Sequence, residues 1–182
     1  MPPPLPVELL PHSPEWAIRA AFESQRLSDA LGPALIAVHH ISSTAIPDIA
    51  AKPIIDMLLE VPSLDALDQR QRDIHTLGYE WHGEYGIAGR RYCTLTDTRT
   101  GKRVIQVHCF ETGSPDVGRH LAFRDYLRSH PDKARAYEAE KQRARLLHPD
   151  DSHAYTAEKS AFVQALEAEA LAELHGEEPP AP

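Results

Sequence analysis

The sequence predicts an α/β (α+β) fold: a small mixed sheet flanked by helices, with a C-terminal helical segment. Three observations lead to this prediction. Two apolar, strand-like runs flank a turn of small residues within residues 38–61. Two further strand-like runs, residues 90–96 and 103–110, are joined by the turn sequence DTRTGK and have the pattern of a hairpin. From residue 116 onward, apolar residues recur at helical spacing.

The N-terminal part begins with a proline-rich segment and continues with a helix. Residues 1–11 contain five prolines, which remove backbone donors, so we expect a flexible, extended arm. Ser13 and Pro14 are residue types preferred at an N-cap and at the first helical position, and Gly32 with Pro33 ends the helix that they open. The side chains expected to anchor this helix in the core are Trp16, Phe22, Leu27 and Leu31.

A hydroxyl-rich turn follows the first expected strand, residues 35–41. Ser42, Ser43 and Thr44 supply hydroxyl and backbone N–H groups where the strand gives way to a helical start. Such an arrangement can bind phosphate through local dipoles rather than net charge. An ordinary capped turn is the alternative, because serine and threonine are favoured at helix N-caps in any case. Lys52 is placed to reach a phosphate at this turn, and a surface lysine is the alternative.

Asp56 is the acid that distinguishes the second expected strand, PIIDMLLEV. Alternate positions of this strand form an apolar face, which leaves Asp56 on the opposite face. A carboxylate within such a run needs an ion-pair partner, hydrogen bonds or a metal ion, and this favours a functional acid over a structural ion pair. The apolar face comprises Ile55, Met57, Leu59 and Val61, and the other face comprises Ile54, Asp56, Leu58 and Glu60.

The rest of the chain adds helices and the hairpin. A helix is expected over residues 62–78, and in the second strand of the hairpin Gln106 and His108 share one face. Three helices follow, separated by Pro131 and by a break before a last helix over residues 151–174. We therefore expect the arm, one domain over residues 12–175, and a disordered tail over residues 176–182, since 182 residues suffice for one domain with a sizeable core.

The C-terminal helices carry cations at a spacing of four residues. His120 and Arg124 share a helix face and can clamp a phosphate, while pairing of Arg124 with a core acid such as Asp56 is the alternative. A Tyr-x3-Lys spacing occurs twice, and each instance is expected to pack an apolar stem beside a solvated amine. These pairs are Tyr137 with Lys141 and Tyr155 with Lys159.

Composition limits the partners and the compartment. The net charge of −8 argues against general binding of nucleic acid, which relies on basic surface. No apolar run approaches the ~20 residues of a membrane-spanning helix, and the start lacks the pattern of a signal peptide. We therefore expect a cytoplasmic protein with no membrane partner. Cys93 and Cys109 have no metal-binding spacing and are expected to be reduced strand residues. The oligomeric state is not indicated.

Four motifs in the chain resemble those of one family. HISSTAIPDIAAKPIID, residues 40–56, is similar to the signature of the bacterial GrpB family, whose usual form is close to HIGSTAVPGLAAKPIID. YGIAGRRY, VHCFE and HLAFRDYLRSHP match further along the chain, so the resemblance spans about residues 14–162. GrpB proteins are placed in the nucleotidyltransferase superfamily. The resemblance therefore implies a nucleotidyltransferase-like domain.

The resemblance also implies a metal-dependent site. Similar superfamily members use a Gly-Ser turn, a carboxylate pair spaced D-h-[DE] on the next strand and a third carboxylate to bind two divalent metals and a nucleoside triphosphate. Here Ser42 replaces the glycine, Leu58 replaces the second carboxylate of the pair, and His108 resembles the third position. Asp56 is thus the implied catalytic residue and, with His108, the implied ligand of Mg²⁺ or Mn²⁺; a core histidine is the alternative for His108.

These observations lead to two functional hypotheses. In the first, the protein binds a nucleotide or other phosphorylated small molecule and transfers a nucleotidyl group with a divalent metal. In the second, loss of the acid at Leu58 leaves a catalytically degenerate sensor or partner module. Fusion of some GrpB relatives to dephospho-coenzyme A kinase links that module to coenzyme A metabolism. Both use the same expected phosphate site, formed by Ser42, Ser43, Thr44, Lys52, His120 and Arg124.

Overall fold

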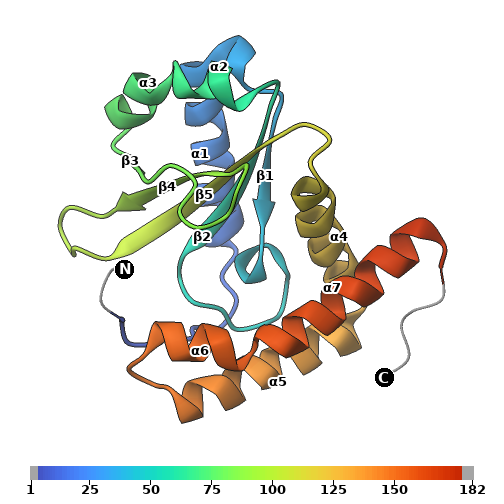
Figure 1. Ribbon diagram of the computed structural model, residues 1–182. Coiled ribbons are helices and arrows are strands. Elements are labelled where there is room, and N and C mark those ends of the chain that lie inside the picture. The colour runs from blue at the N-terminus through green and yellow to red at the C-terminus, as the bar shows by residue number, and fades with distance from the viewer. Residues whose placement is uncertain (1–3, 178–182) are drawn as a thin grey trace.

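The computed structural model describes residues 4–177 and contains one mixed sheet (Figure 1). The strand order is β1-β2-β5-β4-β3, in which β2 and β5 are parallel and the other neighbours are antiparallel. The predicted hairpin is present as β4 and β5. The strands are β1 (Ala37–Ile41), β2 (Ile55–Val61), β3 (Glu80–Trp81), β4 (Arg91–Thr96) and β5 (Arg103–Glu111).

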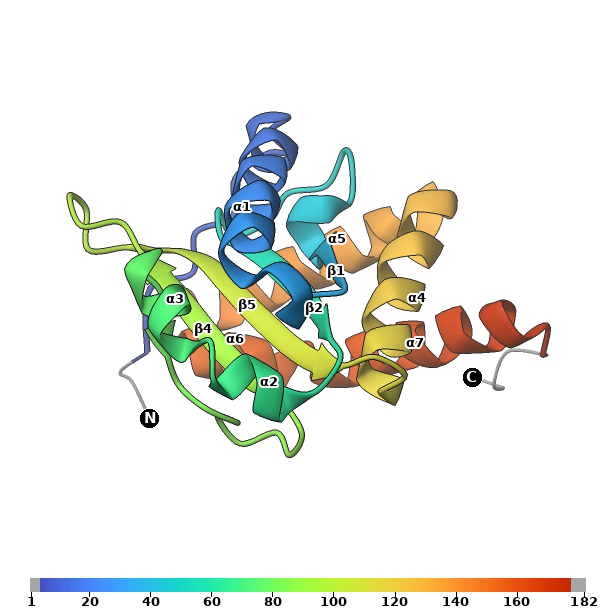
Figure 2. The ribbon, with the colours of Figure 1, turned by 90° about the horizontal axis from the view of Figure 1, so that it is seen from above.

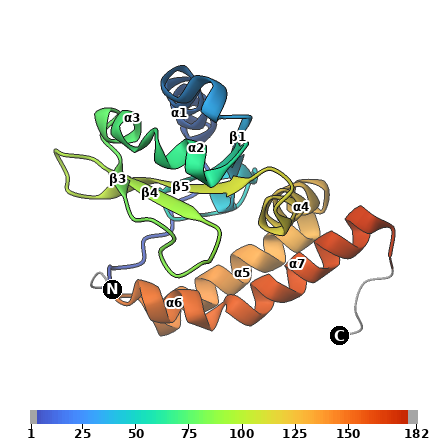
Figure 3. The ribbon, with the colours of Figure 1, turned by 45° about the horizontal axis from the view of Figure 1, so that its top comes forward.

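Helices lie on both sides of this sheet, as the sequence predicts. Figure 3 views the sheet nearly edge-on, with one layer of helices on one side and the C-terminal helices on the other. Figure 2 shows α4 beside the β1 end of the sheet. The first layer contains α1 (Glu15–Leu31), α2 (Leu64–Asp68) and α3 (Gln71–Thr76). The C-terminal group contains α4 (Pro115–Ser129), α5 (Pro131–Leu147), α6 (Ser152–Glu158) and α7 (Ser160–His175).

The main core fills the space between α1–α3 and the sheet. The odd positions of β2 are buried there, which confirms the alternation predicted for this strand. The prediction that Phe22 anchors α1 in the core is wrong, because this residue is 63% exposed. It lies off the helical stripe that faces the sheet. The buried positions of α1 are Trp16, Ala20, Glu23, Leu27 and Leu31.

The opposite face of the sheet is apolar at one end and polar at the other. Leu58 has no exposed surface and belongs to a cluster beneath α4. That cluster comprises Ile41, Leu58, Phe110 and Val117, with Leu121 packed against it. Asp56 precedes Leu58 by two residues on the same face and pairs in register with Gln106. The apolar cover therefore ends where the expected site begins.

Two expected helices are each interrupted. The segment 62–78 forms α2 and α3 with a break at residues 69–70, and the segment 151–174 forms α6 and α7 with a break at Lys159. Short 3-10 helices, Gly32–Ala34 and Ser43–Ala45, follow α1 and β1. No helix within residues 4–177 is long and apolar enough to cross a membrane.

The expected arm is attached to the domain within its described part. The Val7 backbone N–H donates to the Pro149 carbonyl over 2.7 Å, and Leu10 exchanges two 2.9 Å backbone hydrogen bonds with Ala51. The Val7 side chain is buried with Ala144 and Tyr155. Residues 1–3 and residues 178–182 of the expected tail lie outside the described residues.

We predict that Leu58→Ala lowers the free energy of unfolding by about 3 kcal/mol, because it leaves a cavity in the cluster beneath α4. Leu58→Asp should cost more, since an unpaired carboxylate would be buried there. Urea unfolding measures both. Leu146→Ala is the control, because Leu146 is 80% exposed and its loss should change stability by less than ~0.5 kcal/mol. Equal effects of Leu58→Ala and Leu146→Ala would contradict the burial of Leu58.

Candidate functional site

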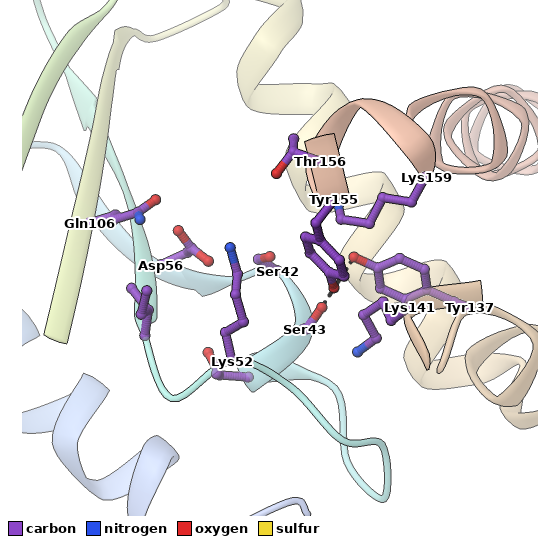
Figure 4. Close-up of a pocket in the computed structure, with 12 residues that line it drawn as sticks. Ser42, Ser43, Lys52, Asp56, Gln106, Tyr137, Lys141, Tyr155, Thr156 and Lys159 are labelled. Atoms are coloured by element: carbon purple, nitrogen blue, oxygen red, sulfur yellow. Dashed lines mark hydrogen bonds between the residues drawn. The ribbon is translucent and has the colours of Figure 1, made fainter. Parts of the chain in front are cut away.

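A cavity of about 210 Å³ opens between the polar end of the sheet and the C-terminal helices (Figure 4). The turn after β1 forms one wall, β2 and β5 form another, and α5 and α6 cover them. The lining residues are Ser42, Ser43, Thr44, Lys52, Ile54, Asp56, Gln106, Tyr137, Lys141, Tyr155, Thr156 and Lys159. The structure thus brings together five of the predicted site residues: Ser42, Ser43, Thr44, Lys52 and Asp56.

The turn after β1 has an unusual backbone conformation at Ser42. Its φ of 63° and ψ of −165° fall in a region that is favourable for glycine and costly for other residues. Asp48 also has a positive φ, 62°. These are the two positions at which the family signature has glycine and this chain does not. Glycine would adopt these conformations without strain, so the serine and aspartate of this chain leave local backbone strain here.

Two arginines of α4 hold this turn in place. Arg124 donates to the His40 carbonyl over 3.2 Å, and Arg128 donates to the Ala45 carbonyl over 2.8 Å. The carboxylate partner of Arg124 is Asp125, at 2.7 Å, rather than Asp56. Arg124 is thus outside the cavity lining and contacts the turn from behind. Its position supports the shape of the turn and does not place it on a ligand in the cavity.

Helix α5 fixes the connection between the turn and β2. The Ala50 N–H donates to Glu138 Oε1 over 2.7 Å, and the Lys141 amine donates to the Ala50 carbonyl. Nearer the turn, the Ser43 hydroxyl donates to the Tyr137 oxygen over 3.1 Å. These three side chains, Tyr137, Glu138 and Lys141, lie within little more than one turn of α5, and they bind the segment that forms the cavity wall.

Three lysine amines enter the cavity lining, and burial lowers the pKa of each. The pKa of Lys141 falls to about 7, and those of Lys52 and Lys159 fall from their usual value, in part offset by Asp56. Lys52 and Lys159 lie 5.4 and 5.6 Å from the centre of the Tyr155 ring. Within residues 4–177 neither has a carboxylate at ion-pair distance. The amines of Lys52 and Lys159 are partly stripped of water, and Asp56 acts on them only from beyond ion-pair distance.

Asp56 is the carboxylate that lines the cavity. Its Oδ1 lies 3.5 Å from His108 Nε2, and both side chains are largely buried. His108 Nδ1 is buried without a hydrogen-bond partner among the described residues. Figure 4 shows the Lys52 amine directed toward Asp56 and Ser42. One carboxylate, that of Asp56, thus lines the cavity together with three lysines.

The residues present do not fit a two-metal centre. Asp56 and His108 offer one carboxylate and one imidazole, and residues 4–177 contain no group of three metal-ligating side chains. Position 58, where the second carboxylate was expected, is enclosed in the apolar cluster beneath α4, so a neighbouring acid does not reach it. Mg²⁺ in proteins is bound through one or two carboxylates together with phosphate oxygens of a ligand. Asp56 could supply the carboxylate of such a site, and a bound ligand would have to supply the phosphate oxygens.

His120 lies behind His108 and not in the cavity. Its ring centre is 5.7 Å from that of His108 and 6.2 Å from that of Phe110. Burial lowers the pKa of His120 to about 4, so its imidazole is neutral near pH 7 and unsuited to hold a phosphate charge. His40 is similar: burial lowers its pKa to about 4, and its ring contacts the Thr44 hydroxyl at 2.8 Å.

The sequence did contain a signal for the lysines of α5 and α6, namely the repeated Tyr-x3-Lys spacing. The expectation of a solvated amine is wrong for Lys141, whose side chain is 1% exposed. Spacing alone places tyrosine and lysine on one helix face. It does not reveal that both faces turn toward the same cavity, because that depends on how α5 and α6 pack.

The sheet order, the serine turn after β1 and the acid on β2 define a nucleotidyltransferase-like protein fold. The structure of a GLD-2/RNP-8 complex matches 84% of this chain at a TM-score of 0.55 and 12% identity, covering 56% of that chain. This likeness shows the fold alone. The chain belongs to the GrpB family: the GrpB protein family model matches residues 6–169.

Individual relatives agree with this assignment. The crystal structure of the conserved protein GrpB from Enterococcus faecalis has a TM-score of 0.86 and 36% identity, covering 92% of this chain and 99% of that one. UPF0157 protein YqkA from Bacillus subtilis is 47% identical over 75% of this chain but only 39% of its own length. A dephospho-CoA kinase from Mycolicibacterium paratuberculosis is 30% identical over 76% of this chain and 40% of its own. The chain thus spans well under half of these two relatives.

We predict that Ser42→Gly stabilises the protein by about 1 kcal/mol. The gain from relieving the strained backbone, ~1–3 kcal/mol, exceeds the extra entropy that glycine has in the unfolded chain. Chemical denaturation measures the change. Ser43→Gly is the matched control, since it should destabilise by removing the hydrogen bond to Tyr137. A Ser42→Gly variant less stable than the wild type would show that the strain is not there.

The lowered pKa of Lys141 gives a second prediction. Between pH 7 and its usual pKa of 10.5, the unfolded chain holds a proton that the folded protein has released, so stability rises with pH. From pH 7 to 9 this one group should add about 2 kcal/mol. Lys141→Met should remove that part of the rise, while Lys133→Met on the same helix should retain it. If the free energy of unfolding rises equally with pH in both variants, the pKa of Lys141 is not lowered by burial.

Proposed function

We propose that the cavity binds the phosphate group of a phosphorylated small molecule, a nucleotide being the first candidate. One observation carries this proposal: Lys52 and Lys159 present amines to a hydroxyl-rich turn, and neither amine has an ion-pair partner among residues 4–177 of a protein whose net charge is −8. A buried cation is costly unless an anion accompanies it. A phosphate that entered the cavity would supply the missing partner and accept hydrogen bonds from the turn.

The chemistry of the site favours recognition over transfer. Asp56 is a single carboxylate, and the position of its usual partner is filled by the buried Leu58. A divalent ion enters this proposal only with the ligand's phosphates, with Asp56 as the carboxylate that contacts it. We therefore favour a binding or sensing protein, and metal-dependent nucleotidyl transfer is the alternative that the same experiments address. The dephospho-CoA kinase relative adds coenzyme A precursors to the ligands worth testing.

Thermal unfolding with inorganic phosphate, pyrophosphate, nucleotides and phosphorylated coenzyme A precursors tests the proposal. A ligand present at 100 times its Kd should raise the free energy of unfolding by about 2.7 kcal/mol. Lys52→Met and Lys159→Met should each weaken binding about 10- to 100-fold, since each removes a charge-assisted hydrogen bond. Lys133→Met, on the far part of α5 from the cavity, is the control for loss of charge and should bind as the wild type does. The proposal fails if no compound binds at millimolar concentration.

Asp56→Asn separates the two functional alternatives. Without metal, this variant should bind phosphate more tightly than the wild type, because the carboxylate that opposes an anion in the cavity is gone. With Mg²⁺ or Mn²⁺, any metal-dependent gain seen in the wild type should disappear. A titration that shows a large metal-dependent gain, together with release of pyrophosphate from a nucleoside triphosphate, would favour the enzyme over the sensor.

A further inference from the structure

A second cavity, of about 240 Å³, adjoins the first. Lys52 and Ile54 line both cavities. The other walls come from two distant parts of the chain, the N-terminal arm and the turn between β4 and β5. The lining residues are Leu5, Pro6, Glu8, Lys52, Pro53, Ile54, Gly101, Lys102 and Arg103.

The second cavity has a different chemical character. Leu5, Pro6, Pro53 and Ile54 give it apolar walls, whereas hydroxyls and amines dominate the first cavity. Lys102 and Glu8 form a 3.5 Å ion pair at its rim, where both side chains are mostly exposed. Lys52 and Arg103 also line this cavity. It is thus suited to an apolar or aromatic group that is attached to an anionic one.

The wall supplied by the arm is held in place before any ligand arrives. Leu5 accepts a 3.1 Å hydrogen bond from the Ser152 N–H, and its own N–H donates to the Ser152 hydroxyl over 3.1 Å. Arg145 donates to the Val7 carbonyl over 3.2 Å. Ser152 begins α6, which also carries Tyr155 and Thr156 into the first cavity. One framework therefore positions walls of both cavities.

Lys52 connects the two spaces. Its amine lies over the Tyr155 ring in the first cavity, and the same residue lines the second. Neither cavity alone reaches the ~300 Å³ that is usual for a small-molecule site, whereas the two together do. A ligand whose charged end meets the amine would thus place the atoms next to that end along the apolar wall.

We propose that the second cavity is a subsite for the organic part of the ligand, so that the protein prefers phosphate monoesters bearing an apolar or aromatic group over inorganic phosphate. This inference rests on the proposed phosphate site and adds to it a substrate class. The phosphate occupies the space among Lys52, Lys159 and the Ser42-Ser43 turn. The ester group extends past Lys52 toward Pro53 and Leu5.

Binding of inorganic phosphate, phenyl phosphate, n-butyl phosphate and phenol, measured by calorimetry, tests this inference. Phenyl phosphate should bind at least about tenfold more tightly than inorganic phosphate, because the ring leaves water for the apolar walls. Leu5→Ser should remove most of that advantage and leave the affinity for inorganic phosphate unchanged. The backbone hydrogen bonds of Leu5 are retained in this variant. Leu10→Ser, on the same arm but outside the cavity lining, should keep the full advantage.

The outcomes separate the two proposals. If none of the three phosphate compounds binds, the phosphate site and the subsite are both overturned. Binding of inorganic phosphate with no gain for the phenyl or butyl ester would overturn the subsite alone, as would a gain that survives Leu5→Ser. Phenol that binds as tightly as phenyl phosphate and depends equally on Leu5 would show an apolar site with no link to phosphate, and would also overturn the inference.

Discussion

The cavity depends on the hydrogen bonds that α5 makes to the backbone of Ala50. Glu138 binds the N–H of that residue and Lys141 binds its carbonyl, so both polar groups of one residue are satisfied by adjacent side chains of one helix. The connection from the turn to β2 has no sheet or helix of its own around Ala50, apart from the bridge between Ala51 and Leu10. Without α5, buried backbone groups there would lack partners, and such groups are costly to bury.

Two residues that line the cavity are in locally unfavourable states. Ser42 adopts a backbone conformation suited to glycine, and Lys141 has its amine buried. Local preference and tertiary structure agree at the capped start of α4 at Ser114 and in the alternating face of β2, whereas Tyr85, with a φ of 47°, is an exception outside the cavity lining. Conflicts of this kind concentrate at functional sites, where the surrounding structure holds an otherwise unfavourable arrangement. The two conflicts that line this cavity, at Ser42 and Lys141, support its assignment as the candidate site.

The sequence was a good guide where a pattern is local. The alternation in PIIDMLLEV placed Asp56 on the correct face, and the cap signals at Pro14 and Gly32 bounded α1. It was a poor guide where packing decides. Phe22 has an anchor's side chain but lies off the buried stripe, and the burial of Lys141 depends on the meeting of α5 with the turn. No spacing within a single helix records which other segment that helix will cover.

The contact between Leu5 and Ser152 joins residues separated by 147 positions in the chain. A contact over such a long loop is slow to form, because closing the loop costs conformational entropy before the contact stabilises the chain. The sheet, the serine turn and Asp56 all lie between these two ends. During synthesis Leu10 of the arm can pair with Ala51 early, whereas Leu5 has no partner at Ser152 until residue 152 has emerged. A nascent chain that already contains β1 to β5 therefore still lacks the contact that holds Leu5 in the apolar wall.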